Sequence, residues 1–248
     1  MGDWFTQACH GVRFDWGPAG AELLAKDAAC LVVVDVLSFT TSVTVAVESG
    51  TRVFPYRWRD ETAAVFADQV GAGLAVGRSR ATESSPWSLS PAALRRAPFT
   101  PRLVLPSPNG STIAASAGES TVVAACLRNA SAVGQWLADR GYGTAERPVV
   151  VIASGERWPD GSLRPALEDL LGAGAVIAAL RRYGRDRLSP EAAATYEGVK
   201  DIGATVADCA SGRELVEWGY ADDVAIATEL DVSEVVPVLA DGAFTAAE

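Results

Sequence analysis

Polar side chains follow four of the apolar segments that the sequence predicts to be strands. Asp35 ends one Val-rich segment, and Asn109, Asn129 and Ser154 each follow a further apolar segment. In open α/β sheets, ligands bind beyond the carboxyl ends of the strands, where the N-termini of the next helices also present free N–H groups to anions. If these strand ends share one edge of a sheet, the sequence predicts a site there for an anionic ligand.

Asp35 is the most informative of these residues because it directly follows Val32–Val34. Burying a carboxylate at that position costs several kcal/mol unless it is paired, hydrogen-bonded or bound to a metal. One interpretation is a carboxylate that caps the following helix. The other is a metal ligand or nucleophile, and the residue types alone favour neither.

Two further acidic residues, Glu168 and Asp169, fall in the first turn of a predicted helix. Negative charge there is favourable toward the helix dipole, which is reason enough for both residues. Adjacent helical residues point about 100° apart, so we expect only one of them to face a site. Together with Asp35, however, these carboxylates could supply the oxygen ligands that Mg²⁺ prefers.

The segment Ser107–Thr112 combines an Asn109–Gly110 turn with the hydroxyl group of Ser111. That hydroxyl could cap the next helix or contact a phosphate. An ordinary turn is the favoured interpretation, because such dipeptides are common between a strand and a helix.

Asn129 opens another predicted helix and suits its N-cap position. Arg128 beside it could reach an anion, although a solvated side chain is the favoured interpretation. This strand end is therefore less specific than the one at Asp35.

Composition excludes several kinds of site and partner. His10 is the only histidine, and the cysteines (Cys9, Cys30, Cys126 and Cys209) form no C-x-x-C pair, so zinc and iron–sulfur sites are not indicated. No Walker or G-x-G-x-x-G motif occurs. A net charge of −10 without a basic tract argues against nucleic acids and anionic membranes. No signal peptide or membrane span is recognisable, and we expect a cytoplasmic protein.

Short Val-rich segments alternate with Ala-rich segments of helical character, which is typical of an α/β protein with a largely parallel or mixed sheet. The predicted strands are Val12–Trp16, Leu31–Asp35, Arg52–Tyr56, Leu74–Val76, Leu103–Leu105, Thr121–Ala124, Val149–Ala153 and Val235–Leu239. The predicted helices are Ala19–Lys26, Thr40–Glu48, Asp60–Val70, Ser111–Ala117, Asn129–Arg140, Pro165–Tyr183, Pro190–Thr195, Ser211–Trp218 and Ala221–Glu229.

A long stretch without regular pattern and a pair of glycines within one helix complete this prediction. The Ser-, Pro- and Arg-rich stretch Arg78–Pro101 is expected to be a long loop. The glycines Gly172 and Gly174 are interpreted as close packing of the helix Pro165–Tyr183 against its neighbour. We expect one domain, residues 1–248, with two intertwined halves (about 1–156 and 157–248) as the alternative.

In their order, these motifs resemble the 2-phosphosulfolactate phosphatase (ComB-like) family. The segments that carry the resemblance are Val32–Thr41, Pro108–Ser111, Asn129–Ala132, Ser154–Glu156, Glu168–Gly174 and Leu230–Pro237. The resemblance implies a three-layer α/β/α sandwich and Mg²⁺-dependent hydrolysis of a phosphate monoester. It also implies a site formed by Asp35, Thr40, Thr41, Asn109, Asn129, Glu168 and Asp169.

The sequence departs from the family pattern at Ser38, where the family has an arginine. Phosphosulfolactate carries a phosphate, a carboxylate and a sulfonate, and each lost charge-assisted hydrogen bond to them should cost about 1.5–3 kcal/mol. Arg78, Arg80 or Arg128 could replace the missing cation.

The resulting hypothesis is a Mg²⁺-dependent phosphatase that acts on a small anionic phosphate ester. Its metal ligands and catalytic residues would be Asp35 with Glu168 or Asp169, and its phosphate-binding residues would be Thr40, Thr41, Asn109, Gly110, Ser111, Asn129, Ser154 and Gly155. A non-catalytic anion-binding or regulatory protein on the same scaffold is the alternative, and an isomerase of phosphosugars is a third possibility. A homodimer is expected only because homodimers are common.

Overall fold

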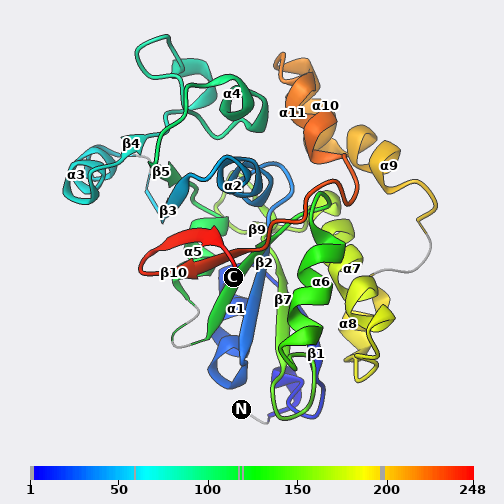
Figure 1. Ribbon diagram of the computed structural model, residues 1–248. Helices are drawn as coiled ribbons and strands as arrows, with labels where there is room; N and C mark the ends of the chain where they lie inside the picture. Colours follow the sequence, from blue (N-terminus) through cyan, green and yellow to red (C-terminus); the bar gives the residue numbers. More distant parts are fainter. Residues whose placement is uncertain (1–2, 59, 117, 119, 196–198) are drawn as a thin grey trace.

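The Val-rich and Ala-rich segments fold as the strands and helices of an α/β protein (Figure 1). The computed structural model describes residues 3–58, 60–116, 118, 120–195 and 199–248. The strands are β1 (Val12–Trp16), β2 (Cys30–Val34), β3 (Arg52–Tyr56), β4 (Gly73–Leu74), β5 (Arg102–Pro106), β6 (Thr121–Ala125), β7 (Val149–Ala153), β8 (Glu156–Arg157), β9 (Leu163–Arg164), β10 (Pro237–Ala240) and β11 (Ala243–Ala246).

The helices occupy most of the segments predicted for them. They are α1 (Gly17–Leu24), α2 (Phe39–Glu48), α3 (Glu61–Val70), α4 (Pro91–Arg96), α5 (Gly110–Ala115), α6 (Ala130–Asp139), α7 (Leu167–Arg182), α8 (Pro190–Ala194), α9 (Ile202–Asp208), α10 (Ala210–Glu217) and α11 (Ala221–Ala227). The predicted end of the α5 segment, Ala117, lies outside the described residues. No helix in the described ranges is long and apolar enough to cross a membrane.

Among the described residues, the main sheet has nine strands in the order β1-β7-β2-β6-β10-β11-β3-β5-β4. The strands β1, β7, β2 and β6 form one parallel section, and β3, β5 and β4 form another. The antiparallel hairpin β10–β11 lies between the two sections and pairs with β6 on one side and with β3 on the other. The prediction of a largely parallel or mixed sheet is therefore confirmed.

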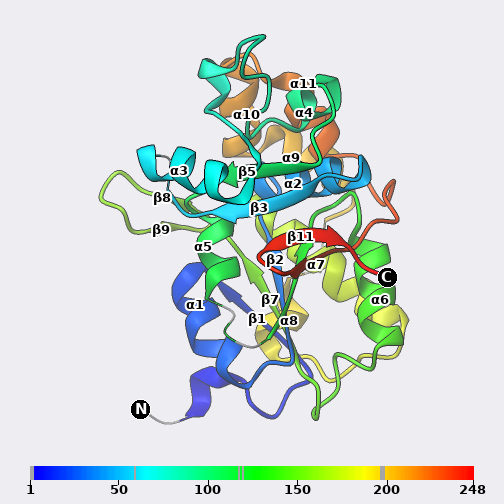
Figure 2. The ribbon, with the colours of Figure 1, turned by 60° about the vertical axis from the view of Figure 1, so that its left-hand side comes forward.

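The central strand β2 explains why its sequence is apolar throughout. Side chains alternate between the two faces of a sheet, and the even-numbered side chains, among them Val32 and Val34, pack in one core with α6 and α7. The odd-numbered Leu31 and Val33 pack in a second core with α1, α2 and α5. Helices cover both faces of this strand, which confirms the three-layer α/β/α sandwich (Figures 1 and 2).

The two parallel sections have opposite directions along the order of the sheet, because three antiparallel pairings separate β6 from β3. In space, however, β3 lies steeply across the direction of β2 (Figures 1 and 2). Right-handed twist accumulates from strand to strand in such sheets. As a result, the carboxyl end of β5 comes close to the carboxyl ends of β2 and β7, as the contacts at the site demonstrate.

The prediction that Arg78–Pro101 is a loop throughout is wrong. A 3₁₀ turn occupies Arg78–Arg80, and α4 occupies Pro91–Arg96. The Ser90 hydroxyl accepts a hydrogen bond from Ala93 N at 3.0 Å, and Pro91 occupies the first turn, so local capping starts this short helix. The sequence prediction also omits α9, β11 and the β8–β9 hairpin.

The interpretation of Gly172 as a close-packing residue is confirmed. A Cβ atom added there would lie 2.7 Å from Val36 Cγ2 and 2.8 Å from Val34 Cγ1. Gly134 of α6 plays the same part against α7, since an added Cβ would lie 2.4 Å from Ala179 Cβ. Both glycines bring α7 close to its neighbours, and α7 carries the two acidic residues of the site.

We predict that Gly172→Ala lowers the free energy of unfolding by about 1–3 kcal/mol, because the added methyl group overpacks the contact with β2. In an exposed helix, replacing glycine by alanine is stabilising by roughly 1 kcal/mol. At residue 172 we expect the cost of overpacking to exceed this gain. Urea unfolding provides the measurement. Gly77→Ala is the control, since nothing lies within 4 Å of the Cβ position at Gly77. A variant at residue 172 as stable as the parent would contradict the packing argument.

Candidate active site

Three hydrogen bonds with Phe39 and Thr40 hold Asp35 at the N-terminus of α2. Phe39 N donates to Asp35 Oδ1 at 3.0 Å. The Thr40 hydroxyl accepts from Asp35 N at 2.9 Å and donates to Asp35 O at 2.8 Å. Both interpretations of Asp35 remain compatible with this geometry, because one carboxylate oxygen accepts a helix N–H and the other faces the start of α5.

Asp169 joins the ends of two neighbouring strands to the start of α7. Its Oδ1 accepts from Val36 N at 2.7 Å, and its Oδ2 accepts from Gly155 N at 2.8 Å. The side chain is almost completely buried. The structure thus brings Asp169 to the residue that follows Asp35, although the two are far apart along the chain.

Four carboxyl groups interact at this edge of the sheet, and we name Asp35, Glu156, Glu168 and Asp169 the acidic cluster. Burial raises the pKa of Asp169 well above its ordinary value, and the charges of Asp35 and Glu168 raise it further. Burial, followed by the same two charges, raises the pKa of Glu156 to about 7. The cluster therefore holds protons at a pH where isolated carboxyl groups are charged.

Two neighbours oppose this upward shift at Glu156. They are the positive charge of Arg164 and a hydrogen bond from the side-chain amide of Asn109, and both lower its pKa. Asn109 Nδ2 donates to Glu156 Oε2 at 3.2 Å, which links the end of β5 to the end of β7. Glu156 was foreseen only as part of the Ser154–Glu156 motif, and its place three residues after the end of the buried strand β7 was the available signal.

Glu168 has a sulfur neighbour that the sequence analysis missed. Cys209 Sγ donates to Glu168 Oε2 at 3.2 Å, and Gly212 N donates to the same sulfur at 3.4 Å. Burial and the charge of Glu168 raise the pKa of the Cys209 thiol to about 11, so the thiol stays protonated as a donor. Its spacing from Glu168 along the chain gave no signal of this contact.

Gly110 allows α5 to begin directly against Asp35. An added Cβ would lie 3.0 Å from Asp35 Oδ2 and 2.2 Å from Phe39 Cδ1, so a larger residue does not fit without movement. Next to it, the buried hydroxyl of Ser111 makes no hydrogen bond within the described part of the chain, and neither does the buried hydroxyl of Ser154. Unsatisfied buried hydroxyls are uncommon, and among the described residues those of Ser42 and Ser88 are unsatisfied as well.

The remaining predicted phosphate-binding residues are engaged with the backbone. The Thr41 hydroxyl donates to Val36 O at 2.8 Å, and the Thr40 hydroxyl is used at Asp35 as described. The Asn129 amide accepts from Cys126 N and donates to Ala124 O and Val235 O. No hydrogen bond between described residues joins Asn129 to the acidic cluster.

Of the three arginines proposed to replace a cation at Ser38, Arg78 contacts that serine. Arg78 Nη2 donates to Ser38 Oγ at 2.6 Å. Arg128 is buried and pairs instead with Glu48 and Glu229. Arg80 lines a cavity of about 860 Å³ that extends to Pro106 at the end of β5.

The acidic cluster has the donor type that a hard divalent cation prefers, since all four side chains offer carboxylate oxygens. Their mutual repulsion is a second reason why positive charge would be favourable there. Within the described ranges, however, no group of three or more His, Cys, Asp or Glu side chains is arranged to hold a metal ion. The side chains offer the type of ligand atom that such an ion prefers, but they are not already arranged as a coordination site.

Comparison with known proteins gives consistent relatives. A protein named probable 2-phosphosulfolactate phosphatase from Pseudothermotoga lettingae is 26% identical over 222 residues, covering 86% of this chain and 90% of the relative. Proteins of the same name from Thermotoga maritima and Carboxydothermus hydrogenoformans are 25% and 27% identical, each covering 86% of this chain and 90% and 87% of the respective relative.

A family model described as 2-phosphosulpholactate phosphatase matches residues 20–242. These residues include the whole acidic cluster, the strands that carry it and the helices on both faces of the sheet. The resemblance noted from the ordered motifs is confirmed, and the chain belongs to the 2-phosphosulpholactate phosphatase family of phosphoric monoester hydrolases.

Proposed function

We propose that this protein hydrolyses 2-phosphosulfolactate, a small phosphate monoester with further negative charge, and that it uses Mg²⁺ bound at the acidic cluster. The observation that carries this proposal is the convergence of Asp35, Glu156, Glu168 and Asp169 at the carboxyl ends of β2 and β7. The names of the relatives support the same substrate.

The proposal assigns the acidic residues different tasks. Asp35 faces the phosphate, because one of its oxygens lies toward Gly110 at the start of α5. Asp169 positions the two strand ends, since both of its oxygens accept backbone N–H groups. Glu156, whose pKa is raised to about 7 in the cation-free protein, is the side chain proposed to exchange a proton with the attacking water or the leaving alcohol.

The unsatisfied hydroxyls of Ser111 and Ser154 are proposed to donate to the phosphate oxygens. Thr40, Thr41 and Asn129 hold the loops around the site, because their polar atoms already bind the backbone. Gly155 shares this positioning role through its N–H bond to Asp169.

Asp35 and Glu168 are the side chains proposed to hold the cation, with Asp169 completing the oxygen ligands after small rearrangements. A bound divalent cation would neutralise the charge that develops on the phosphoryl oxygens and favour in-line displacement. Glu168 remains available for this role because its neighbour Cys209 donates to only one of its oxygens.

We predict that Asp35→Asn lowers kcat for phosphate release from 2-phosphosulfolactate by at least about 100-fold, because the negative charge that would hold the cation beside the phosphate is lost. Asparagine keeps the size and the acceptor for Phe39 N, so the fold should persist. Asp68→Asn, on the exposed side of α3, is the matched control. Turnover by the residue 35 variant at the parental rate would remove Asp35 from the mechanism. Binding of the ester without turnover by the unmodified protein would favour the non-catalytic alternative.

We also predict that charging of Glu156 destabilises the cation-free protein. Its folded-state pKa is raised from 4.5 to about 7, so the folded state binds more protons than the unfolded state between these values. The free energy of unfolding of the parent, relative to Glu156→Gln, should therefore fall by up to about 3 kcal/mol as the pH rises from 4.5 to 7.

Denaturant unfolding of both proteins across this pH range measures the difference. Millimolar Mg²⁺ should restore stability to the parent above pH 7 and have less effect at pH 5, where protons compete with the cation. Parallel pH profiles for the two proteins would contradict the raised pKa, and stability unaffected by Mg²⁺ at every pH would contradict the cation site.

A further inference from the structure

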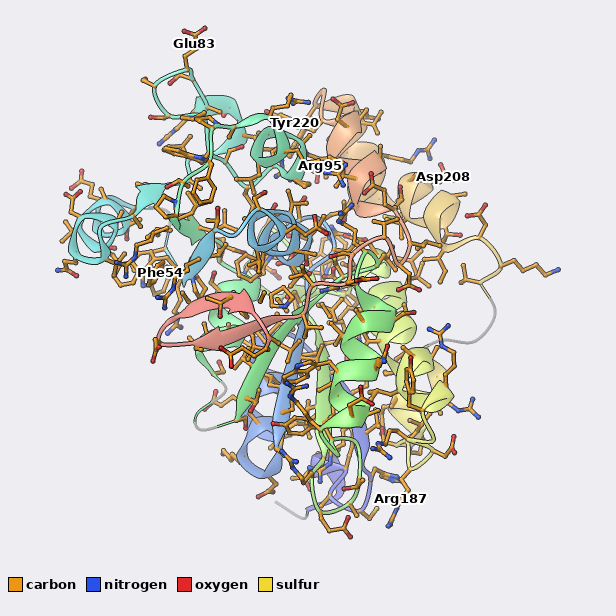
Figure 3. The ribbon with its side chains drawn as sticks, in the orientation of Figure 1. Phe54, Glu83, Arg95, Arg187, Asp208 and Tyr220 are labelled. Carbon is orange, nitrogen blue, oxygen red and sulfur yellow. The ribbon has the colours of Figure 1, made fainter. Side chains whose placement is uncertain are left out.

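A partly buried ion pair fixes Arg78 beside the loop that carries Asp35. Arg78 Nε donates to Asp223 Oδ2 at 2.9 Å, and Arg78 Nη2 donates to Ser38 Oγ at 2.6 Å. Its guanidinium also lies over the ring of Tyr220, 5.5 Å from the centroid. Tyr220 is labelled between α4 and α11 in Figure 3. Two segments distant from Arg78 in the sequence, the one at Ser38 and the one at Tyr220–Asp223, thus hold this arginine in a defined orientation.

Asp223 is itself fixed independently of Arg78. Its Oδ1 accepts from the Ser90 hydroxyl at 2.5 Å and from Ala92 N at 3.1 Å, at the start of α4. The Asp223 side chain is only 1% exposed, so its geometry does not depend on solvent. An arginine held by such a carboxylate is oriented before any ligand arrives, which reduces the entropic cost of binding.

The guanidinium retains donors for a ligand. An arginine side chain has five N–H donors, and the described partners of Arg78 use one on Nε and one on Nη2. Neither hydrogen of Nη1 is used by a described residue. The side chain is 18% exposed, which allows contact with a small molecule.

The contact with Ser38 places the donors of Arg78 beside the loop that carries Asp35, where the proposed function puts the phosphate. Ser38 directly precedes Phe39, whose N–H group holds Asp35 Oδ1. Residues on either side of this arginine, Gly77 and Arg80, line the cavity of about 860 Å³ that reaches Pro106, at the end of the strand that precedes Asn109 in the sequence. A ligand with its phosphate at Asp35 could therefore place a second charged group toward Arg78.

We propose that Arg78 recognises a second anionic group of the substrate, a carboxylate or a sulfonate, and so selects for phosphate esters that carry one. This inference rests on the proposed function and names the residue that sets its specificity. The fork of Arg78 matches the paired oxygens of either group, and Asp223 acts as its positioning residue.

Arg78→Gln tests this selection through three esters: 2-phosphosulfolactate, 2-phospholactate, which lacks the sulfonate, and an aryl phosphate, which has neither group. The kcat/KM for 2-phosphosulfolactate relative to the aryl phosphate should fall by about 10- to 100-fold, as expected for loss of charge-assisted hydrogen bonds. An equal fall for 2-phospholactate would assign the contact to the carboxylate, and a smaller one to the sulfonate. Arg78→Lys should give an intermediate ratio.

Arg96→Gln is the matched control. Arg96 of α4 likewise pairs with an aspartate of α11, through an exposed ion pair with Asp222 at 3.3 Å, and its loss should leave the ratio unchanged. If Arg78→Gln lowers kcat/KM equally for all three esters, Arg78 serves only to hold the segments together, and the inference is overturned.

A binding measurement separates this inference from the proposed function. Sulfolactate, which has the carboxylate and sulfonate but no phosphate, should raise the melting temperature of the parent protein and of Arg96→Gln but not that of Arg78→Gln. If the parent hydrolyses none of the esters, the proposed function fails, and this pattern of stabilisation still supports anion recognition by Arg78. Equal stabilisation of all three proteins, or of none, would overturn it.

Discussion

The arrangement of the site depends on the two hydrogen bonds that the Asp169 carboxylate accepts from the backbone. This carboxylate accepts from Val36 N and Gly155 N, and it thereby fixes the loops after β2 and β7 to the first turn of α7. Gly172, one turn further along, allows that helix to approach β2 closely enough for the contact. A buried carboxylate with two backbone donors is well compensated as a hydrogen-bond acceptor. Its charge is less well compensated, because other acidic groups surround it.

This electrostatic conflict distinguishes the site from the rest of the core. Elsewhere among the described residues, buried charges are compensated: Arg128 pairs with Glu48 and Glu229, and Asp223 pairs with Arg78. Arg13 donates instead to backbone carbonyl groups. In the acidic cluster, the charges of Asp35 and Glu168 add to the burial that raises the pKa values of Glu156 and Asp169, and Arg164 only partly offsets this at Glu156. Such an arrangement lowers stability, and proteins retain local conflicts of this kind chiefly at functional sites. A bound cation and the positive charge of Arg78 would allow an anionic ester to enter this region.

Much of the fold could be predicted from the sequence because β2 and its neighbours are apolar on both faces, which requires helices on both sides of the sheet. The contacts of the site were harder to foresee. Nothing in the spacing of Cys209 from Glu168, or of Arg78 from Ser38, indicates that these pairs touch, because tertiary packing alone brings them together. Asn129 is the opposite case, because the sequence suggested a place at the site that its contacts do not give it. Like Asn109, it follows a strand. The side-chain amide of Asn129 nevertheless donates a hydrogen bond to the backbone carbonyl group of Val235, in the segment before β10. The functional roles of the site residues and the number of domains remain predictions.

The β10–β11 hairpin has a consequence for the order in which the molecule assembles. Val238 pairs with Val123 of β6, and Phe244 pairs with Val53 of β3, so the hairpin joins the two parallel sections. These residues are synthesised after every other strand of the sheet. On the ribosome, β3 and β6 must therefore keep open edges until the hairpin emerges, and exposed edges of this kind are prone to pairing with other chains. Completion of the nine-stranded sheet thus depends on a segment that follows all of its other strands in the sequence.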